Sequence, residues 1–342
     1  MSGTLQLRLE EVHELARSAC EANGCSGEQA RAIADTITAA ERDQCHSHGL
    51  FRVPFFVRAM RESGVAPRAE PRLEELAPAI LRVDGGLGFA PLALETGCNA
   101  LIERAREQGI AALCLNNVFH ISALWPEVER LADAGLVGFA FTGAIDYVAP
   151  AGGDKPLYGT NPMAFAWPRN DQPPIVFDQA SAASARGEIQ VHLREGKPIP
   201  EGWAVGPDGQ PTTDPETALA GAQLPFGGHK GASIALMVEL LAGALIGDLF
   251  SYEAGEHDRA GVGAPRGGEF LLAIDPARCV ADGNREAQIE HAERLFRRIL
   301  EQDGTRLPGQ RRFEARARAA AEGVTVPRSL HDQIQAFIAG TA

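Results

Sequence analysis

Apolar side chains recur at helical spacing near the start of the chain. Over residues 9–24 they share one face and stop at Asn23-Gly24, which predicts a helix. The pattern Ser26-x-x-Gln29 is typical of a capping box and predicts that a second helix begins there. A third, short helix is predicted over residues 55–62. The N-terminal part of the chain is therefore expected to be helical.

After Ala79 short apolar runs alternate with helical patterns. By itself this alternation predicts a βαβαβ unit and a parallel sheet. The apolar run 232–249 contains Glu239, so we expect a buried helix there and not a membrane span. The predicted strands cover 80–83, 110–115, 136–141, 175–177 and 270–274, and the predicted later helices cover 92–108, 123–134, 284–303, 311–321 and 327–339.

Composition narrows the class of protein. The chain has 342 residues, 45% of them hydrophobic, which is enough for a full core and excludes wholesale disorder. The formal net charge of -13 disfavours nucleic acids and anionic membranes as partners. The first residues lack a signal-peptide pattern and the 6 cysteines form no C-x-x-C pair. We therefore expect a cytoplasmic protein with reduced thiols.

The densest group of reactive side chains lies at residues 43–52. His46, Ser47 and His48 are followed by Arg52. An imidazole is the usual proton donor and acceptor near neutral pH. A guanidinium grips a carboxylate with two parallel hydrogen bonds. This spacing indicates an enzyme that acts on a small carboxylic acid.

Other interpretations of this segment remain open. The two histidines could be ordinary surface residues at the end of a helix. Asp43, Cys45, His46 and His48 could form the site of a metal-dependent hydrolase or lyase. Zinc sites usually have a second pair of ligands at similar spacing, and none follows, so we predict no metal. A catalytically silent binding protein is a further alternative.

The sequence has no standard dinucleotide motif. Segment 86–91 lacks the third glycine of G-x-G-x-x-G and is interpreted as a turn. Segment 227–231, Gly-Gly-His-Lys-Gly, precedes a helix and could bind phosphate or be a plain glycine-rich turn. The polar segment 116–125 follows a strand, and its Ser122 could be only an N-cap. Segment 159–162 is either a binding loop or a proline turn.

Taken together, these motifs resemble the malate/L-lactate dehydrogenase family that lacks a Rossmann fold. Within it the chain is most similar to the Δ1-piperideine-2-carboxylate/Δ1-pyrroline-2-carboxylate reductases. The segments that carry the resemblance are His46-Ser47-His48-Gly49-x-x-Arg52, 117–125, Gly159-Thr160-Asn161-Pro162, Val176-Phe177-Asp178, Ala185-Arg186-Gly187-Glu188, 224–231 and Arg306-Leu307-Pro308-Gly309.

The resemblance implies a different fold from the alternation alone. It implies an α/β (α+β) protein with a central mixed, mostly antiparallel sheet, flanking helices and a helical domain built from both chain ends. It also implies a homodimer with the active site near the partner subunit. We accordingly expect a helical part at 1–75, a central domain at 76–282 that binds cofactor and substrate, and C-terminal helices at 283–342 that return to the helical part.

The implied activity is NADPH-dependent reduction of cyclic imino acids to L-pipecolate or L-proline. The same residues would serve an NAD(P)-dependent 2-hydroxy acid dehydrogenase, which stays the alternative. By resemblance, His48 is the proton donor, with Ser47 and Glu188 as its relay. The implied substrate contacts are Arg52, Thr160, Arg186 and Gly187. The implied cofactor contacts are His120, Ile121, Ser122, Ala123, Leu124, Asp178, Gln179, Ala180, His229, Lys230, Gly304, Thr305, Arg306, Leu307, Pro308, Gly309 and Gln310.

Two positions depart from the pattern of that branch. Glu188 stands where the relay acid is usually Asp, and Arg186 stands where His is usual. NADPH is expected over NADH because Arg306, Arg311 and Arg312 cluster where the family binds adenosine, and Arg can pair with a 2′-phosphate.

Overall fold

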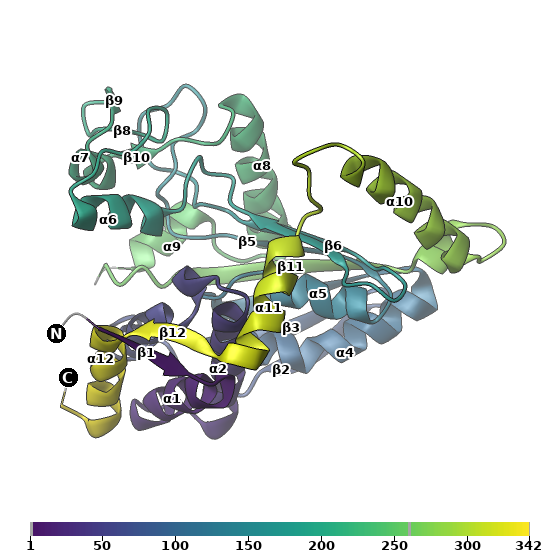
Figure 1. Ribbon diagram of the computed structural model, residues 1–342, viewed down its shortest axis with the longest axis horizontal. Helices are drawn as coiled ribbons and strands as arrows, with labels where there is room; N and C mark the ends of the chain where they lie inside the picture. Colours follow the sequence, from purple (N-terminus) through teal and green to yellow (C-terminus); the bar gives the residue numbers. More distant parts are fainter. Residues whose placement is uncertain (1–2, 259–260, 342) are drawn as a thin grey trace.

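The computed structural model describes residues 3–258 and 261–341. A twisted sheet crosses the molecule, and a helical layer contains both chain ends (Figure 1). The helical layer consists of α1 (Leu9–Ala22), α2 (Gly27–Arg42), α3 (Val53–Glu62) and α12 (Arg328–Ala339). Beside it, β1 (Thr4–Leu7) pairs antiparallel with β12 (Val324–Pro327). The helical part built from both ends is thus confirmed.

The central sheet has seven strands in the order β2-β3-β4-β11-β5-β6-β7. Five of the six neighbouring pairs are antiparallel and only β3–β4 is parallel, which confirms the mixed, mostly antiparallel sheet. The strands are β2 (Arg72–Ala77), β3 (Ile80–Phe89), β4 (Ile110–Phe119), β5 (Val137–Thr142), β6 (Met163–Trp167), β7 (Ile175–Gln179) and β11 (Arg266–Ile274).

The βαβαβ prediction is correct only for β3, α4 (Ala90–Gln108) and β4. After α5 (Trp125–Asp133) the chain forms β5, but β11 lies between β4 and β5 and runs antiparallel to both. β11 comes from much later in the sequence. Local periodicity indicates which residues form strands but carries no information on such a non-local neighbour.

Segment 86–88, interpreted as a turn, is in fact part of β3. Gly86 and Leu87 have φ values of 58° and 66°, and the register of β3 against β4 shifts between Asp84 and Gly88. The glycines therefore produce an irregularity inside a long strand. The chain does not reverse there.

The predicted buried helix at 232–249 is shorter and only half covered. α8 (His229–Glu239) continues into a π-helical turn at Leu240–Ala244. Glu239 is buried, whereas Leu240 and Leu245 are 50% and 62% exposed. Apolar composition alone predicted full burial, but this face has no covering element within the described residues.

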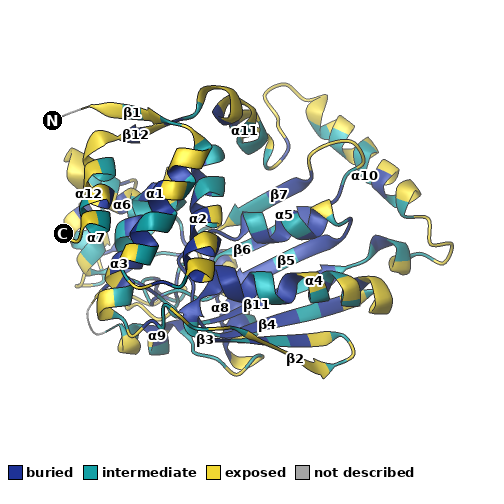
Figure 2. Cartoon of the chain, turned by 90° about the horizontal axis from the view of Figure 1, so that it is seen from below, coloured by how far each residue is buried: buried dark blue, intermediate teal, exposed yellow. Residues whose placement is uncertain are grey.

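The remaining elements surround this framework. Helices α6 (Arg186–Glu195) and α7 (Pro215–Ala220) accompany a small sheet of β8 (Ala204–Val205), β9 (Pro211–Thr212) and β10 (Ala222–Gln223). Helices α9 (Ser251–His257), α10 (Arg285–Leu300) and α11 (Gln310–Glu322) complete the chain. Figure 2 shows the central strands β4, β5 and β11 as the most deeply buried, with α10 and α12 largely exposed.

Within the described ranges, the helices all lack the combination of length and apolar character that crossing a bilayer requires. The six cysteines are all free thiols. The division of the chain at residues 75 and 282 stays a prediction.

Candidate active site

Glu41, buried near the end of α2, shapes the segment that carries the catalytic candidates. Its Oε1 accepts the N–H of Leu50 at 2.8 Å, and its Oε2 lies 2.7 Å from Nδ1 of His46. A Cβ on Gly49 would collide with this carboxylate, so the close approach requires glycine. His46 is therefore engaged in holding the segment.

Ser47 and His48 form the pair that the sequence predicted. Ser47 Oγ lies 3.1 Å from His48 Nδ1. Burial, together with the positive charges of Arg52 and His120, lowers the pKa of His48 to about 3. At neutral pH this imidazole is therefore uncharged and can accept a proton or a hydrogen bond.

Arg52 carries a half-buried guanidinium, and within residues 3–258 and 261–341 no acidic side chain forms an ion pair with it. Its Cζ lies 5.2 Å from the centroid of the Phe55 ring, and its Nε is buried with no hydrogen bond. Desolvation lowers the pKa of Arg52. A buried, unpaired guanidinium is a strong site for a carboxylate, because the anion restores the lost hydrogen bonds and charge balance.

Tyr147 connects Arg52 with Arg186. The Arg186 guanidinium stacks on the Tyr147 ring at 3.9 Å and donates to Leu219 O at 3.1 Å. Tyr147 interacts electrostatically with Arg52 as well. The structure thus gathers two predicted substrate contacts around a tyrosine that sequence reasoning missed. Gly187 adjoins them, and nothing lies within 4 Å of where its Cβ would be.

Asp178 joins two of the segments predicted to contact the cofactor. Its Oδ2 accepts the N–H groups of Leu124 at 2.9 Å and Trp125 at 3.1 Å. α5 begins at Trp125 with Leu124 as its N-cap, so the N-cap interpretation of Ser122 is wrong. Instead, Ser122 Oγ is buried and unpartnered. A hydroxyl left in that state fits a site that is completed by a ligand.

Thr160 lies where three loops meet. The N–H and Oγ of Ser181 donate to Thr160 O at 2.8 and 3.0 Å, and the N–H of Phe226 donates to Ser181 O at 3.0 Å. Gly227 and Gly228 then adopt φ values of 57° and 63°, directly before α8. His229 and Lys230 are exposed at the start of that helix. The positive end of a helix dipole and a lysine there suit a phosphate group.

Asn161 in the same loop has a structural role that the sequence analysis missed. It is completely buried, and its Nδ2 donates to Ala235 O at 3.1 Å and Glu239 Oε1 at 2.7 Å. Its Oδ1 accepts from Ser251 Oγ at 3.1 Å. These bonds fix the loop to α8 and α9. Glu239, an acidic residue inside an apolar run, was the sequence signal that a buried polar partner would lie next to it.

The segment 304–310 lies against β7. Gly309 has φ 86°, and the carbonyl oxygen of Val176 is 3.1 Å from where its Cβ would be. Arg312 donates to Val176 O at 2.7 Å and lies 5.2 Å over the Trp125 ring. Of the three arginines considered for a 2′-phosphate, Arg312 is therefore engaged in holding the structure, whereas Arg306 and Arg311 are exposed.

Glu188 is not joined to the catalytic pair. Its side chain is 55% exposed, and its carboxylate lies 4.0 Å from Nε2 of His192. Within the described ranges, no hydrogen bond connects it with Ser47 or His48. Its relay role stays a prediction.

The residues of the alternative metal site have other partners. Both Asp43 oxygens accept bonds from Arg316, and Glu41 holds His46. In a different group, an imidazole nitrogen of His120 and carboxylate oxygens of Glu127 and Glu269 lie within 4.8 Å of one another.

With this geometry in view, comparison with known proteins identifies the family. The model of the malate/L-lactate dehydrogenase family matches residues 7–335. This chain belongs to the malate/L-lactate dehydrogenase family.

Within the family, several relatives carry the same kind of name. The chain is 51% identical to a Δ1-pyrroline-2-carboxylate/Δ1-piperideine-2-carboxylate reductase of Pseudomonas aeruginosa, over 98% of this chain and 99% of the relative. It is 42% identical to a (2R)-3-sulfolactate dehydrogenase (NADP+) of Chromohalobacter salexigens, over 97% of each. The crystal structure of Δ1-piperideine-2-carboxylate reductase from Pseudomonas syringae superposes with a TM-score of 0.92 at 38% identity, covering 97% of this chain and 99% of that one. As a family member, the protein is an oxidoreductase that uses a nicotinamide cofactor.

Proposed function

We propose that this protein reduces Δ1-pyrroline-2-carboxylate and Δ1-piperideine-2-carboxylate to L-proline and L-pipecolate with NADPH. The observation that carries this proposal is the reductase name of relatives about half identical over nearly the whole chain. The pairing of Ser47 and His48 near a half-buried arginine, which has no acidic partner among the described residues, supports it.

Substrate binding depends first on attraction between a positive side chain and the substrate carboxylate. Arg52 grips the α-carboxylate, which neutralises one of the two positive groups that hold down the pKa of His48. Thr160, Arg186 and Gly187 complete the substrate contacts. Because Arg186 is held in place by stacking on Tyr147, we expect it to influence which ring size is accepted.

The proton requirement of the reaction falls to His48. The cofactor supplies a hydride to the C=N carbon, and the nitrogen ends with one proton more than in the neutral imine. Because the pKa of His48 is about 3 before ligands bind, its imidazole is neutral and accepts a hydrogen bond from the protonated imine. It thereby keeps the proton on the nitrogen during hydride arrival. Ser47 Oγ, next to Nδ1, orients the ring.

The cofactor contacts come from four segments that the structure holds together. Asp178 bonds the backbone of segment 120–124, segment 178–180 leads into Ser181, and segment 225–230 bonds to Ser181 through Phe226. Segment 304–310 packs on β7 through Gly309. The buried, unpartnered hydroxyl of Ser122 and the glycine turn before α8 fit a dinucleotide. NADPH in preference to NADH rests on the exposed Arg306 and Arg311, which can pair with a 2′-phosphate.

A homodimer is part of the proposal. Leu236, Met237, Leu240 and Leu245 leave an apolar face on α8 and the turn after it, with exposed fractions of 37–62%. Contiguous apolar surface of this kind favours association. Sedimentation analysis of the purified protein tests it, and a monomer at micromolar concentration contradicts it.

A cytoplasmic location is proposed on the sequence grounds given above.

A spectrophotometric panel tests the activity. NADPH oxidation is followed with Δ1-pyrroline-2-carboxylate, Δ1-piperideine-2-carboxylate, pyruvate and oxaloacetate, and each is repeated with NADH. We expect turnover with the two cyclic imines and a preference for NADPH. Turnover of the keto acids alone would overturn the imine assignment and favour the second candidate, a 2-hydroxy acid dehydrogenase. That candidate is supported by the 42% identity to the sulfolactate dehydrogenase.

A further inference from the structure

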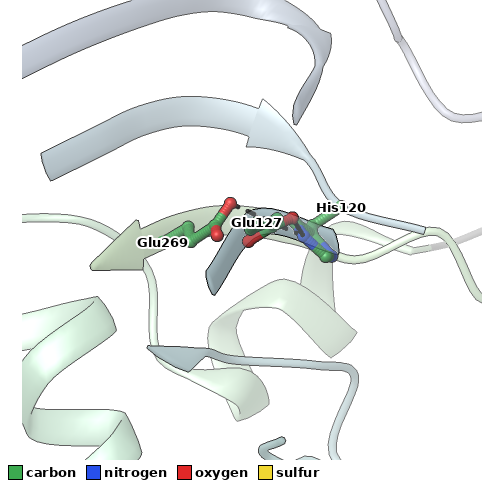
Figure 3. Close-up of side chains that lie close together, drawn as sticks. All are labelled: His120, Glu127 and Glu269. Atoms are coloured by element: carbon green, nitrogen blue, oxygen red, sulfur yellow. Dashed lines mark hydrogen bonds and ion pairs between the residues drawn. The ribbon is translucent and has the colours of Figure 1, made fainter. Parts of the chain in front are cut away.

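Three buried titratable side chains meet beneath the cofactor segments, and two of them, Glu127 and Glu269, have no part in the mechanism above. Glu127 lies in the first turn of α5, Glu269 in β11, and His120 directly after β4. His120 Nε2 is 3.2 Å from Glu127 Oε1 and 3.5 Å from Glu269 Oε2. Figure 3 shows the two carboxyl groups directed towards each other and towards the imidazole.

The two carboxyl groups have no basic side chain to balance them. Within residues 3–258 and 261–341, neither pairs with an arginine or lysine. Both oxygens of Glu269 and Oε2 of Glu127 are buried with no hydrogen bond. Two ionised carboxylates so close together in a dry interior repel each other and lack solvation. A positive charge or a proton must therefore be held between them.

The groups on neighbouring elements favour a proton over a positive charge between the two carboxyl groups. Asp178 at the end of β7 adds negative charge near Glu127, and Cys98 on α4 is a thiol whose pKa burial raises to about 11. His120 is the basic group that faces the pair. Burial raises the pKa of Glu127 to about 8, and burial together with Glu127 raises the pKa of Glu269 well above its usual value. The pair thus holds a proton at physiological pH.

The cluster lies under two segments assigned to the cofactor. His120 is the first residue of segment 120–124, and Glu127 is in the first turn of the helix that follows it. Asp178 holds the end of that segment through two N–H groups. A change of charge in the cluster is therefore felt by a ligand lying on these segments. It reaches His48 as well, which interacts electrostatically with His120.

We propose that Glu127 and Glu269 share a proton beside His120 and thereby make dinucleotide binding proton-linked. The pair holds this proton when NADPH is bound, and loss of the proton at alkaline pH adds a negative charge beneath the anionic cofactor. Only loss of the proton to solvent weakens binding. By linkage, bound NADPH in turn favours the protonated cluster. This inference rests on the proposed nicotinamide role of the site.

The test is NADPH affinity as a function of pH. Fluorescence titration of the purified wild-type protein at pH 7 and pH 9.5 is expected to show a Kd at least about fivefold higher at the alkaline pH. The double variant Glu127→Gln/Glu269→Gln keeps the shape and hydrogen-bonding capacity of neutral carboxyls but cannot ionise. Its Kd should stay near the neutral-pH wild-type value at both pH values. Glu301→Gln, exposed after α10, is the matched control and should behave as wild type.

Three outcomes overturn the inference. One is a double variant with the same alkaline weakening as wild type. Another is a wild-type Kd that does not change with pH. The third is one divalent metal ion per purified chain that is lost in Glu269→Gln, because the carboxylates would then be ionised ligands.

Should the double variant not fold, infrared spectroscopy of the wild type decides, since a protonated buried carboxyl band must be present at pH 7 and vanish at high pH. Absence of NADPH binding at every pH contradicts the proposed function instead, and the infrared band still tests the shared proton.

Discussion

The indole N–H of Trp125 donates a hydrogen bond to Oδ2 of Asp43 at 3.1 Å. This bond connects the end of α2, in the helical layer, with the start of α5 beside the sheet. The His48 ring meets the Trp125 ring edge-on, with centroids 6.3 Å apart and planes at 86°. The position of the proposed catalytic imidazole therefore depends on how Asp43 holds Trp125.

Asp43 is also the centre of a buried ion-pair network, and removing its charge should be costly. Arg316 bonds both Asp43 oxygens at 3.0 and 2.8 Å and also bonds Glu129. In Asp43→Asn, Arg316 loses one of the two carboxylates that balance its charge. We therefore expect a loss of roughly 2–4 kcal/mol in the free energy of unfolding. Urea denaturation measures this loss. Glu301→Gln should change stability by less than about 0.5 kcal/mol, and an equally small change in Asp43→Asn would contradict the network's role.

The pKa values of His46 and His48 should be shifted in opposite directions. The hydrogen bond that His46 makes to the Glu41 carboxylate raises the pKa of His46, whereas burial lowers that of His48 to about 3. Histidine NMR titration of the ligand-free protein should show His46 above the ordinary value of about 6.5 and His48 uncharged down to pH 4. Titration of His48 near 6.5 would contradict the buried, neutral imidazole.

The same shifts set the sign of two stability effects. As the pH falls, His48 takes up a proton in the unfolded chain before it does so in the folded protein. Its contribution to the free energy of unfolding is therefore intact above about pH 6.5 and is lost as the pH falls towards 3. For His46 the contribution is present below about 6.5 and is lost as the pH rises through its raised pKa. In His48→Asn, stability should accordingly fall less steeply between pH 6 and 4 than in wild type.

Turnover should depend strongly on His48. In His48→Asn the side chain can no longer hold the proton on the substrate nitrogen, and we expect kcat to fall by roughly two to four powers of ten. NADPH affinity should stay within about threefold of wild type, because His48 lies outside the proposed cofactor segments. Steady-state kinetics and fluorescence titration separate the two effects. Unchanged kcat removes His48 from the mechanism.

Replacing Arg52 by lysine should mainly weaken substrate binding. Lysine keeps the positive charge but loses the planar fork that bonds both carboxylate oxygens. We expect KM for the imine to rise roughly tenfold or more, with a smaller change in kcat. Arg298→Lys, exposed in the last turn of α10 and paired with Glu301, serves as the control. Equal KM values in wild type and Arg52→Lys would show that the carboxylate binds elsewhere.

Glu188→Gln tests the third member of the predicted relay. Because the carboxylate is more than half exposed and has no hydrogen bond to the catalytic pair, we expect kcat to change by less than about threefold. A loss approaching that of His48→Asn would show instead that Glu188 joins Ser47 and His48 when substrate is bound.

Much of the local structure was predictable from the sequence. The helix after Ser26 begins there, with Ser26 Oγ accepting the N–H of Gln29, and the reactive segment follows the end of α2. The predictable features depend on side-chain periodicity and capping, which act over a few residues. The adjacency of Ser47 and His48 follows from the chain itself. The family's motifs indicated the mixed sheet that local alternation had obscured.

The sequence alone determined the short-range features: where most helices and strands lie, which segment carries the imidazole and guanidinium, and which glycines permit tight turns. Tertiary structure alone decided that β11 separates β4 from β5, that Asp43 meets Trp125 and Arg316, and that Glu127 and Glu269 meet at His120. These contacts join residues far apart in the chain. Their existence depends on burial and charge balance in the packed interior, which a linear pattern of residue types does not contain.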